Sequence, residues 1–248
     1  MGLNTKSYIL IIISAVVITL VLSLLRINQF AVIIIEIIGS LIIYIAWLMI
    51  KSTRITKILE EKCDPVLYLE KCTKSHMAHP DYNKAVAYLS LGEYEKALDL
   101  LLDGDIPKKM TQIMKVTYRA ALMSCYIVMG DLEKAGREYE NHIKEMRKGL
   151  LVPKVAFSID LMVLEYQYKL NATPETATYF LEQLRYLYGI NSKVLSKRQR
   201  LSVLYTEAEL LDFVGEKEAA ALLYKRVAAE GNTLHIAALA KKKLEALG

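Results

Sequence analysis

The sequence has few of the residues that interrupt helices or crosslink chains. Its 248 residues include only 5 prolines and 11 glycines, the glycines gather at the ends of segments, and no stretch alternates polar and apolar residues for long. The 3 cysteines are too few for a disulfide scaffold and suit a reducing compartment. The composition also excludes a disordered tail and a multispanning transporter. We predict an all-α protein.

Motifs that mark catalytic sites are absent as well. The sequence has no Gly-x-x-x-x-Gly-Lys, Gly-x-Gly-x-x-Gly, Gly-x-Ser-x-Gly or His-Glu-x-x-His. Phosphate-binding loops, nucleophile elbows and helix-borne zinc pairs therefore have no support. We expect a protein that is not an enzyme and that needs no cofactor and no metal.

What the sequence does have is an apolar excess near its N-terminus. The chain is 54% hydrophobic, and residues 8–50 contain 34 apolar residues out of 43. After a tail at 1–7, two apolar runs at 8–25 and 30–50 would form helices of about 27 and 32 Å, close to the membrane core. Four residues between them suffice for a tight turn, which predicts a transmembrane helical hairpin. The alternative, a signal peptide at 8–25, lacks a small-x-small cleavage site.

Basic residues around the two runs predict the orientation of the hairpin. One arginine, Arg26, lies in the turn, whereas the outer flanks carry Lys6, Lys51, Arg54, Lys57 and Lys62. Because basic residues favour the cytoplasmic side, both termini and the rest of the chain should be cytoplasmic, on a cell-membrane protein with two spans.

Glu36 is the one ionisable residue within either run. In a hairpin that turns at 26–29 it lies at the depth of Thr19. We interpret the pair as a polar contact that fixes the hairpin or a partner helix. A proton or ion relay is the alternative, and it would need more such groups.

Beyond residue 50 the pattern is helical, with a juxtamembrane segment at 51–78. Asp64-Pro65 and His79-Pro80 each predict a helix start. A pattern of aromatic, turn glycine, acid, aromatic, small and large residues then recurs. Its copies are Tyr88, Gly92, Glu93, Tyr94, Ala97 and Leu101; Tyr126, Gly130, Asp131, Leu132, Ala135 and Tyr139; Tyr168, Ala172, Ala177 and Leu181; and Leu211, Gly215, Glu216, Ala220 and Tyr224.

At these residues the chain resembles the tetratricopeptide repeat (TPR) family, whose turn carries Gly-acid-aromatic-x-x-Ala. Gly92 to Ala97 match this pattern fully, Gly130 to Ala135 and Gly215 to Ala220 lack the aromatic, and the third copy lacks the glycine. The spacings of 38, 42 and 43 residues between turns exceed the family's usual 34. The resemblance implies an α-solenoid of four helix pairs over 79–231, and a capping helix follows at 232–248. A generic helical bundle is the alternative.

The resemblance also implies binding rather than catalysis, because stacked first helices of this family line a concave surface for a protein or peptide partner. That surface would present Tyr82, Val86, Leu89, Ala120, Ser124, Ile127, Met162, Tyr166, Lys169, Tyr205, Glu209 and Asp212. We therefore expect a membrane-anchored scaffold or adaptor, and as the alternative a ligand- or peptide-sensing regulator that uses the same groove.

Two other features call for a choice between interpretations. Cys63, Cys72, His76 and His79 could form a tetrahedral zinc site, but their spacing matches no known ligand pattern, and incidental thiols are the simpler interpretation. A nucleic-acid site needs a continuous basic face, and acids elsewhere on the chain interrupt any such face that the basic runs at 193–200 and 241–243 could form. We therefore expect solvated helix faces and no nucleic-acid partner. Weak attraction to anionic lipid is the alternative for these runs. The sequence does not indicate an oligomeric state.

Overall fold

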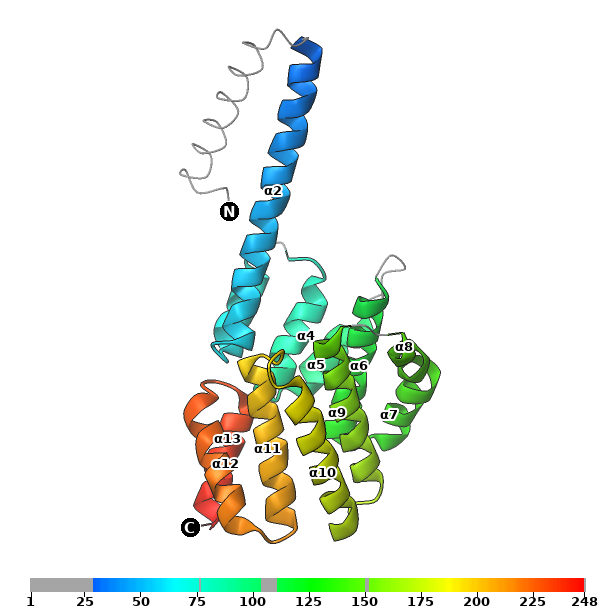
Figure 1. Cartoon of the computed structure of the whole chain (residues 1–248), viewed down its shortest axis with the longest axis vertical. Helices are drawn as coiled ribbons and strands as arrows, with labels where there is room; N and C mark the ends of the chain where they lie inside the picture. The colour runs from blue at the N-terminus through cyan, green and yellow to red at the C-terminus, as the bar shows by residue number, and fades with distance from the viewer. Residues whose placement is uncertain (1–28, 76, 104–110, 150–151, 248) are drawn as a thin grey trace. The chain divides into compact units, whose positions relative to one another are not determined.

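The computed structural model describes residues 29–75, 77–103, 111–149 and 152–247, with the side chains of residues 29–32 and 36 excepted (Figure 1). Within these ranges every regular element is a helix and no strand occurs, which confirms the predicted all-α class. The chain divides into two compact units, Met1–Arg54 and Ile55–Gly248.

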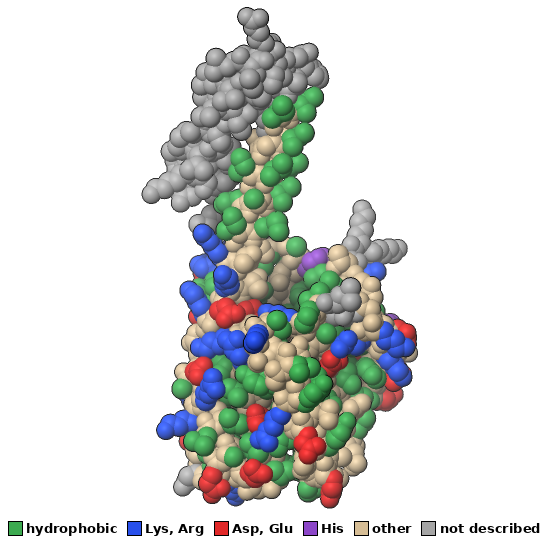
Figure 2. Space-filling view, viewed as in Figure 1, with side chains coloured by type: hydrophobic (Ala, Val, Ile, Leu, Met, Phe, Trp, Pro, Cys, Tyr) green, Lys and Arg blue, Asp and Glu red, His purple; other side chains and the backbone are tan. Residues whose placement is uncertain are grey.

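Helix α2 (Gln29–Glu60) contains the apolar run predicted at 30–50 and continues to Glu60. Its segment Ile33–Glu60 is the one described helix that is long and apolar enough to cross a membrane. Large apolar side chains such as Ile37, Ile42 and Met49 are exposed along it (Figure 2). The run at 8–25, with Thr19, lies outside the described residues, as does the side chain of Glu36, so the second span and the polar contact stay predictions.

The second unit consists of helices that pack largely in sequence order (Figure 1). They are α3 (Pro65–Thr73), α4 (Pro80–Leu91), α5 (Tyr94–Asp103), α6 (Gln112–Met129), α7 (Leu132–Glu138), α8 (Lys144–Lys148), α9 (Pro153–Leu170), α10 (Pro174–Asn191), α11 (Lys197–Phe213), α12 (Lys217–Glu230) and α13 (His235–Leu247). A π-helical segment, η1 (Tyr139–Ile143), joins α7 to α8.

Several of these helices begin where the sequence carries a start signal. Helix α3 begins at Pro65, and the Asp64 side chain accepts a hydrogen bond from the Leu67 backbone N–H at 2.9 Å. Helix α4 begins at Pro80. Proline suits the first helical position because its missing N–H would have no partner there. The predicted starts at Asp64-Pro65 and His79-Pro80 are confirmed.

Three glycines end the first helices of three helix pairs in the same way. Gly92, Gly130 and Gly215 have φ of +79°, +80° and +91°, a left-handed conformation that costs glycine little. At Gly92 the backbone N–H of the glycine donates to the Leu89 carbonyl at 3.2 Å, and the next N–H donates to the Tyr88 carbonyl at 2.9 Å. The same two hydrogen bonds recur at Gly130 and Gly215.

The small residue of each copy lies where the two helices of a pair meet. Ala97, Ala135, Ala177 and Ala220 are all 0% exposed, each on the second helix of its pair. A methyl side chain lets two helices approach closely. The pattern that recurs in the sequence is thus a recurring packing arrangement in the pairs α4–α5, α6–α7, α9–α10 and α11–α12.

The last helix returns to the first pair. Helix α13 packs on α12 and α11, and it also contacts α4. The His235 ring meets the Tyr94 ring edge-on, with centroids 6.0 Å apart, and lies against Gly92. Helix α13 therefore contacts both the last pair and the first. The first helices of the four pairs, α4, α6, α9 and α11, are called the inner helices here.

Candidate functional site

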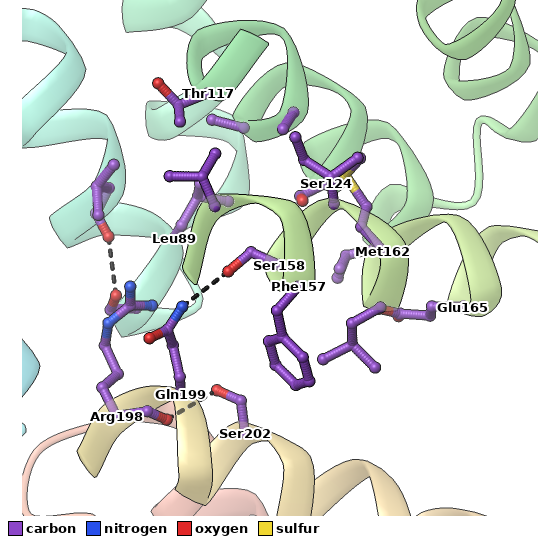
Figure 3. A pocket seen from close by; sticks show the side chains of 18 of the residues that line it. Leu89, Thr117, Ser124, Phe157, Ser158, Met162, Glu165, Arg198, Gln199 and Ser202 are labelled. Carbon is purple, nitrogen blue, oxygen red and sulfur yellow. Dashed lines mark hydrogen bonds between the residues drawn. The ribbon is translucent and has the colours of Figure 1, made fainter. Parts of the chain in front are cut away.

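The central pocket is a cavity of about 500 Å³ that opens partly to solvent between α4, α6, α9, α11 and the start of α13. Figure 3 shows side chains from four of these helices pointing toward it, including Leu89 of α4, Ser124 of α6 and Met162 of α9. On α4, α6 and α11 the residues that reach the pocket recur mainly every three or four positions, so each of these helices turns one face toward it, whereas α9 lines it with most of the residues from Lys154 to Met162. The walls are mainly apolar.

Polar groups gather at the α9–α11 side of the central pocket. The Gln199 side-chain amide donates to the Ser158 hydroxyl at 2.8 Å (Figure 3). Gln199 also accepts from Ser196 in a capping box that begins α11. Ser202 reaches the carbonyl oxygen of Arg198 at 3.2 Å. On the opposite wall the Thr117 hydroxyl donates to the carbonyl oxygens of Ile113 and Met114, each at 3.0 Å, and the Ser124 hydroxyl lines the pocket as well.

Glu60, the last residue of α2, holds an ionic cluster at the edge of the central pocket. Its carboxylate accepts two hydrogen bonds from the Arg198 guanidinium, at 2.8 and 3.2 Å, and lies 3.4 Å from the Lys154 Nζ. The Ser196 hydroxyl donates to the same carboxylate. Because the side chain of Glu60 is only 14% exposed, this cluster joins α2 to α9 and α11 with little solvent screening.

Charge explains the ionisation of Glu60. Burial opposes its negative charge, but the charge of Arg198, the hydrogen bond from Ser196 and the charge of Lys154 outweigh burial and lower the pKa from 4.5 to about 2. Arg198 belongs to the basic run that we expected to be a solvated face. The structure corrects that expectation at Arg198, whose side chain is only 26% exposed and pairs with Glu60.

Half of the residues predicted for a concave surface line the central pocket. They are Tyr82, Val86, Leu89, Ala120, Ser124 and Met162. Three others, Lys169, Glu209 and Asp212, line a second cavity of about 380 Å³ near the other end of α9 and α11. Glu165 lies on the wall of both cavities.

The remaining three predicted residues face elsewhere. Ile127 is 1% exposed and belongs to the core between α4 and α9. Tyr205 is buried in the core of the C-terminal helices, and the hydroxyl of Tyr166 lies against Gly136 of α7. Each lies on an inner helix, but on the side of that helix that packs into the core. The repeated sequence pattern does not define which side of the helix each of these positions occupies.

The two cysteines suggested as zinc ligands lie in different cores. Cys63 belongs to the core of the C-terminal helices, and Cys72 belongs to the core formed by the end of α2 with α3 and α4. His79 is the residue before α4, and His76 lies outside the described residues. Burial raises the pKa of the Cys72 thiol, which disfavours the thiolate that a metal needs.

Sequence reasoning did not identify Glu60, Lys154, Arg198 or His235 as parts of the site. The sequence does contain one signal near these residues, a Ser-x-x-Gln capping box at Ser196 to Gln199, and it marks the start of α11. Nothing in the sequence links that start to Glu60, which is more than 130 residues away.

No family model, no curated protein and no solved structure matches this chain.

Proposed function

We propose that this chain is a membrane-anchored binding protein whose central pocket receives a short apolar segment of a protein or peptide partner. The observation that carries the proposal is the convergence of residues from four inner helices on one pocket, with Leu89, Ser124 and Met162 among them. A volume of about 500 Å³, mainly apolar walls and a few polar groups are typical of binding sites. Catalysis is not part of the proposal.

The proposal includes a TPR-like α-solenoid as the architecture. Support comes from the three identical glycine turns and from the four fully buried alanines at equivalent positions. In such an array the inner helices present the binding surface. We propose a short bound segment because α13 contacts α4 and its first residues, His235 and Ile236, also line the pocket.

Membrane anchoring is the second part of the proposal. Helix α2 supplies one span and the run at 8–25 supplies the other, with both termini and the helical domain on the cytoplasmic side. Tethering confines the pocket to a thin layer beside the membrane and raises its effective concentration for a partner there. A modest affinity then suffices for recruitment, as in a scaffold or adaptor.

The orientation is tested by cysteine labelling. The three native cysteines are buried, so an exposed cysteine introduced as Lys241→Cys would be the one readily labelled thiol. With a membrane-impermeant maleimide we expect labelling only after the cells are permeabilised. Labelling in intact cells would place α13 outside the cytoplasm and refute the orientation.

A ligand-sensing regulator is the second candidate. It is favoured by the closure at His235 and Tyr94, because a ligand in the central pocket would contact both the inner helices and the start of α13. Burial, and then the charge of Lys242, lower the pKa of His235, so this ring is neutral at physiological pH. Stabilisation of the chain against heat by a small molecule, with no protein partner recovered, would favour this candidate.

Site-specific photo-crosslinking tests the binding function. A photoreactive amino acid at Val128, which is 43% exposed and lines the central pocket, should crosslink the partner in intact cells. The matched control is Ile190, which is 63% exposed on α10 and lines neither the central pocket nor the second cavity. We expect one defined adduct at Val128 and none at Ile190. Equal yields at both positions would assign binding to the outer surface instead.

A further inference from the structure

The second cavity combines aromatic walls with carboxylates and is called the aromatic pocket here. Tyr168 of α9 contacts Phe180 of α10, with ring centroids 5.8 Å apart, and meets Phe213 of α11 edge-on at 6.1 Å. All three rings line the pocket, and Phe213 is 49% exposed. Aromatic faces carry partial negative charge, and they attract cations within about 6 Å of the ring centre.

The charged groups of the aromatic pocket do not balance. Three carboxylates line it, those of Glu165, Glu209 and Asp212, against the two ammonium groups of Lys169 and Lys243. Lys169 pairs with Glu165 at 3.5 Å, and Lys243 pairs with Asp212 at 3.3 Å. Both lysines of the pocket thus have a carboxylate already, and one negative charge is left over.

Glu209 carries that charge. Its carboxylate accepts a hydrogen bond from the Tyr205 hydroxyl at 3.0 Å, but no ion pair within 4 Å joins it to a described residue. Glu209 is exposed in the structure, so its carboxylate is open to a ligand. The surrounding protein raises its pKa, while the hydrogen bond from Tyr205 and the charges of Lys243 and Lys169 act against this rise. A cation that enters the pocket would find this carboxylate available for pairing.

The lining of the aromatic pocket makes an organic cation a better fit than a metal ion. The rings of Phe213 and Tyr168 can pack on the alkyl part and the positive end of a ligand. A metal ion needs several oxygen ligands around one point, and the carboxylates of the described residues form no such group. The volume of about 380 Å³ is ample for a butylammonium-sized group.

We propose that the aromatic pocket binds an alkylammonium group, paired with Glu209 and packed on Tyr168 and Phe213. The group has two sources with the same chemistry: a lysine side chain of a peptide, or a free diamine. The proposal goes beyond the function of the central pocket, and its test requires no partner.

The test is saturation-transfer NMR on the full chain in zwitterionic lipid nanodiscs. The probes are Nα-acetyl-lysine methylamide, 1,4-diaminobutane and, as a neutral analogue of the first, Nα-acetyl-norleucine methylamide. We expect both cations to bind saturably and the neutral probe to bind at least about tenfold more weakly, as expected for the loss of a charged hydrogen bond. The tighter of the two cations identifies the source.

Variants locate the binding. Glu209→Gln keeps an acceptor for Tyr205 but removes the charge, and it should weaken both cations about tenfold. Phe213→Leu should weaken them about threefold through the lost ring face. Glu218→Gln, which removes an exposed charge of α12 outside the pocket, should change nothing. Far-UV circular dichroism checks that each variant is folded.

Three results would overturn the proposal. Equal binding of the neutral and charged probes would show that charge is not recognised. Unchanged binding to a folded Glu209→Gln variant would place the cation elsewhere. Absence of saturable cation binding would mean that Lys169 and Lys243 together neutralise the carboxylate of Glu209.

Discussion

Glu60→Gln should lower the free energy of unfolding of the helical domain by about 3 kcal/mol at neutral pH. The substitution removes the charge that pairs with Arg198 and Lys154 in a cluster where Glu60 is 14% exposed. Removing one partner of a mostly buried ion pair leaves the other charges without compensation. Partial exposure of Lys154 reduces the loss somewhat. Urea unfolding of the full chain in detergent, followed by far-UV circular dichroism, measures it.

The same residue predicts a pH dependence. The pKa of Glu60 is about 2 in the folded chain and 4.5 ordinarily, so the folded state favours the ionised carboxylate. Stabilisation from a lowered pKa is complete above the unfolded pKa and is lost as the pH falls through the folded one. The difference between wild type and Glu60→Gln should therefore be full at neutral pH and shrink between about pH 4.5 and pH 2.

Glu61→Gln is the matched control. Glu61 is the exposed neighbour of Glu60, and its substitution removes the same formal charge. It should leave the unfolding midpoint almost unchanged. If both variants unfold at the same urea concentration, the ionic cluster does not hold the end of α2 against α9 and α11.

Ala220→Leu should destabilise the helical domain by about 2–3 kcal/mol. Ala220 is 0% exposed where α12 meets α11, and its three counterparts in the other pairs are equally buried. A larger side chain would push the helices apart or force neighbouring side chains from their preferred rotamers. Urea unfolding of the full chain gives the difference.

The control for this variant lies on the same helix. Ala229 is exposed on α12, so Ala229→Leu adds the same side chain without entering the core. Its effect should stay within about 0.5 kcal/mol. Equal effects of the two variants would mean that the recurring alanine does not set the distance between paired helices.

Local features of the fold could be predicted from the sequence. A glycine followed by an acid, as at Gly92 and Gly130, specifies a left-handed turn through its own backbone freedom. Pro65 and Pro80 mark helix starts for an equally local reason. The position of each buried alanine follows from the turn before it, since the offset is constant.

Contacts between distant segments could not be predicted. The pairing of Glu60 with Arg198 and the contact of His235 with Tyr94 depend on the summed crossing angles of the helices between them. Small differences in each angle accumulate, and the sequence pattern does not specify them. For the same reason the inner-helix residues could be identified, but not which of them face the pocket: Ser124 lines it, whereas Ile127 is buried in the core.

The central claim is that a partner occupies the central pocket, and a blocked pocket tests it most directly. Ser124→Trp places a large ring among the side chains that converge there (Figure 3). We expect this substitution to abolish the photo-crosslink from Val128 while the chain stays folded and in the membrane. Tyr179→Trp, at an exposed position on α10, should leave the crosslink intact. An undiminished crosslink in the Ser124→Trp chain would contradict the account, because the partner would then bind without entering the pocket.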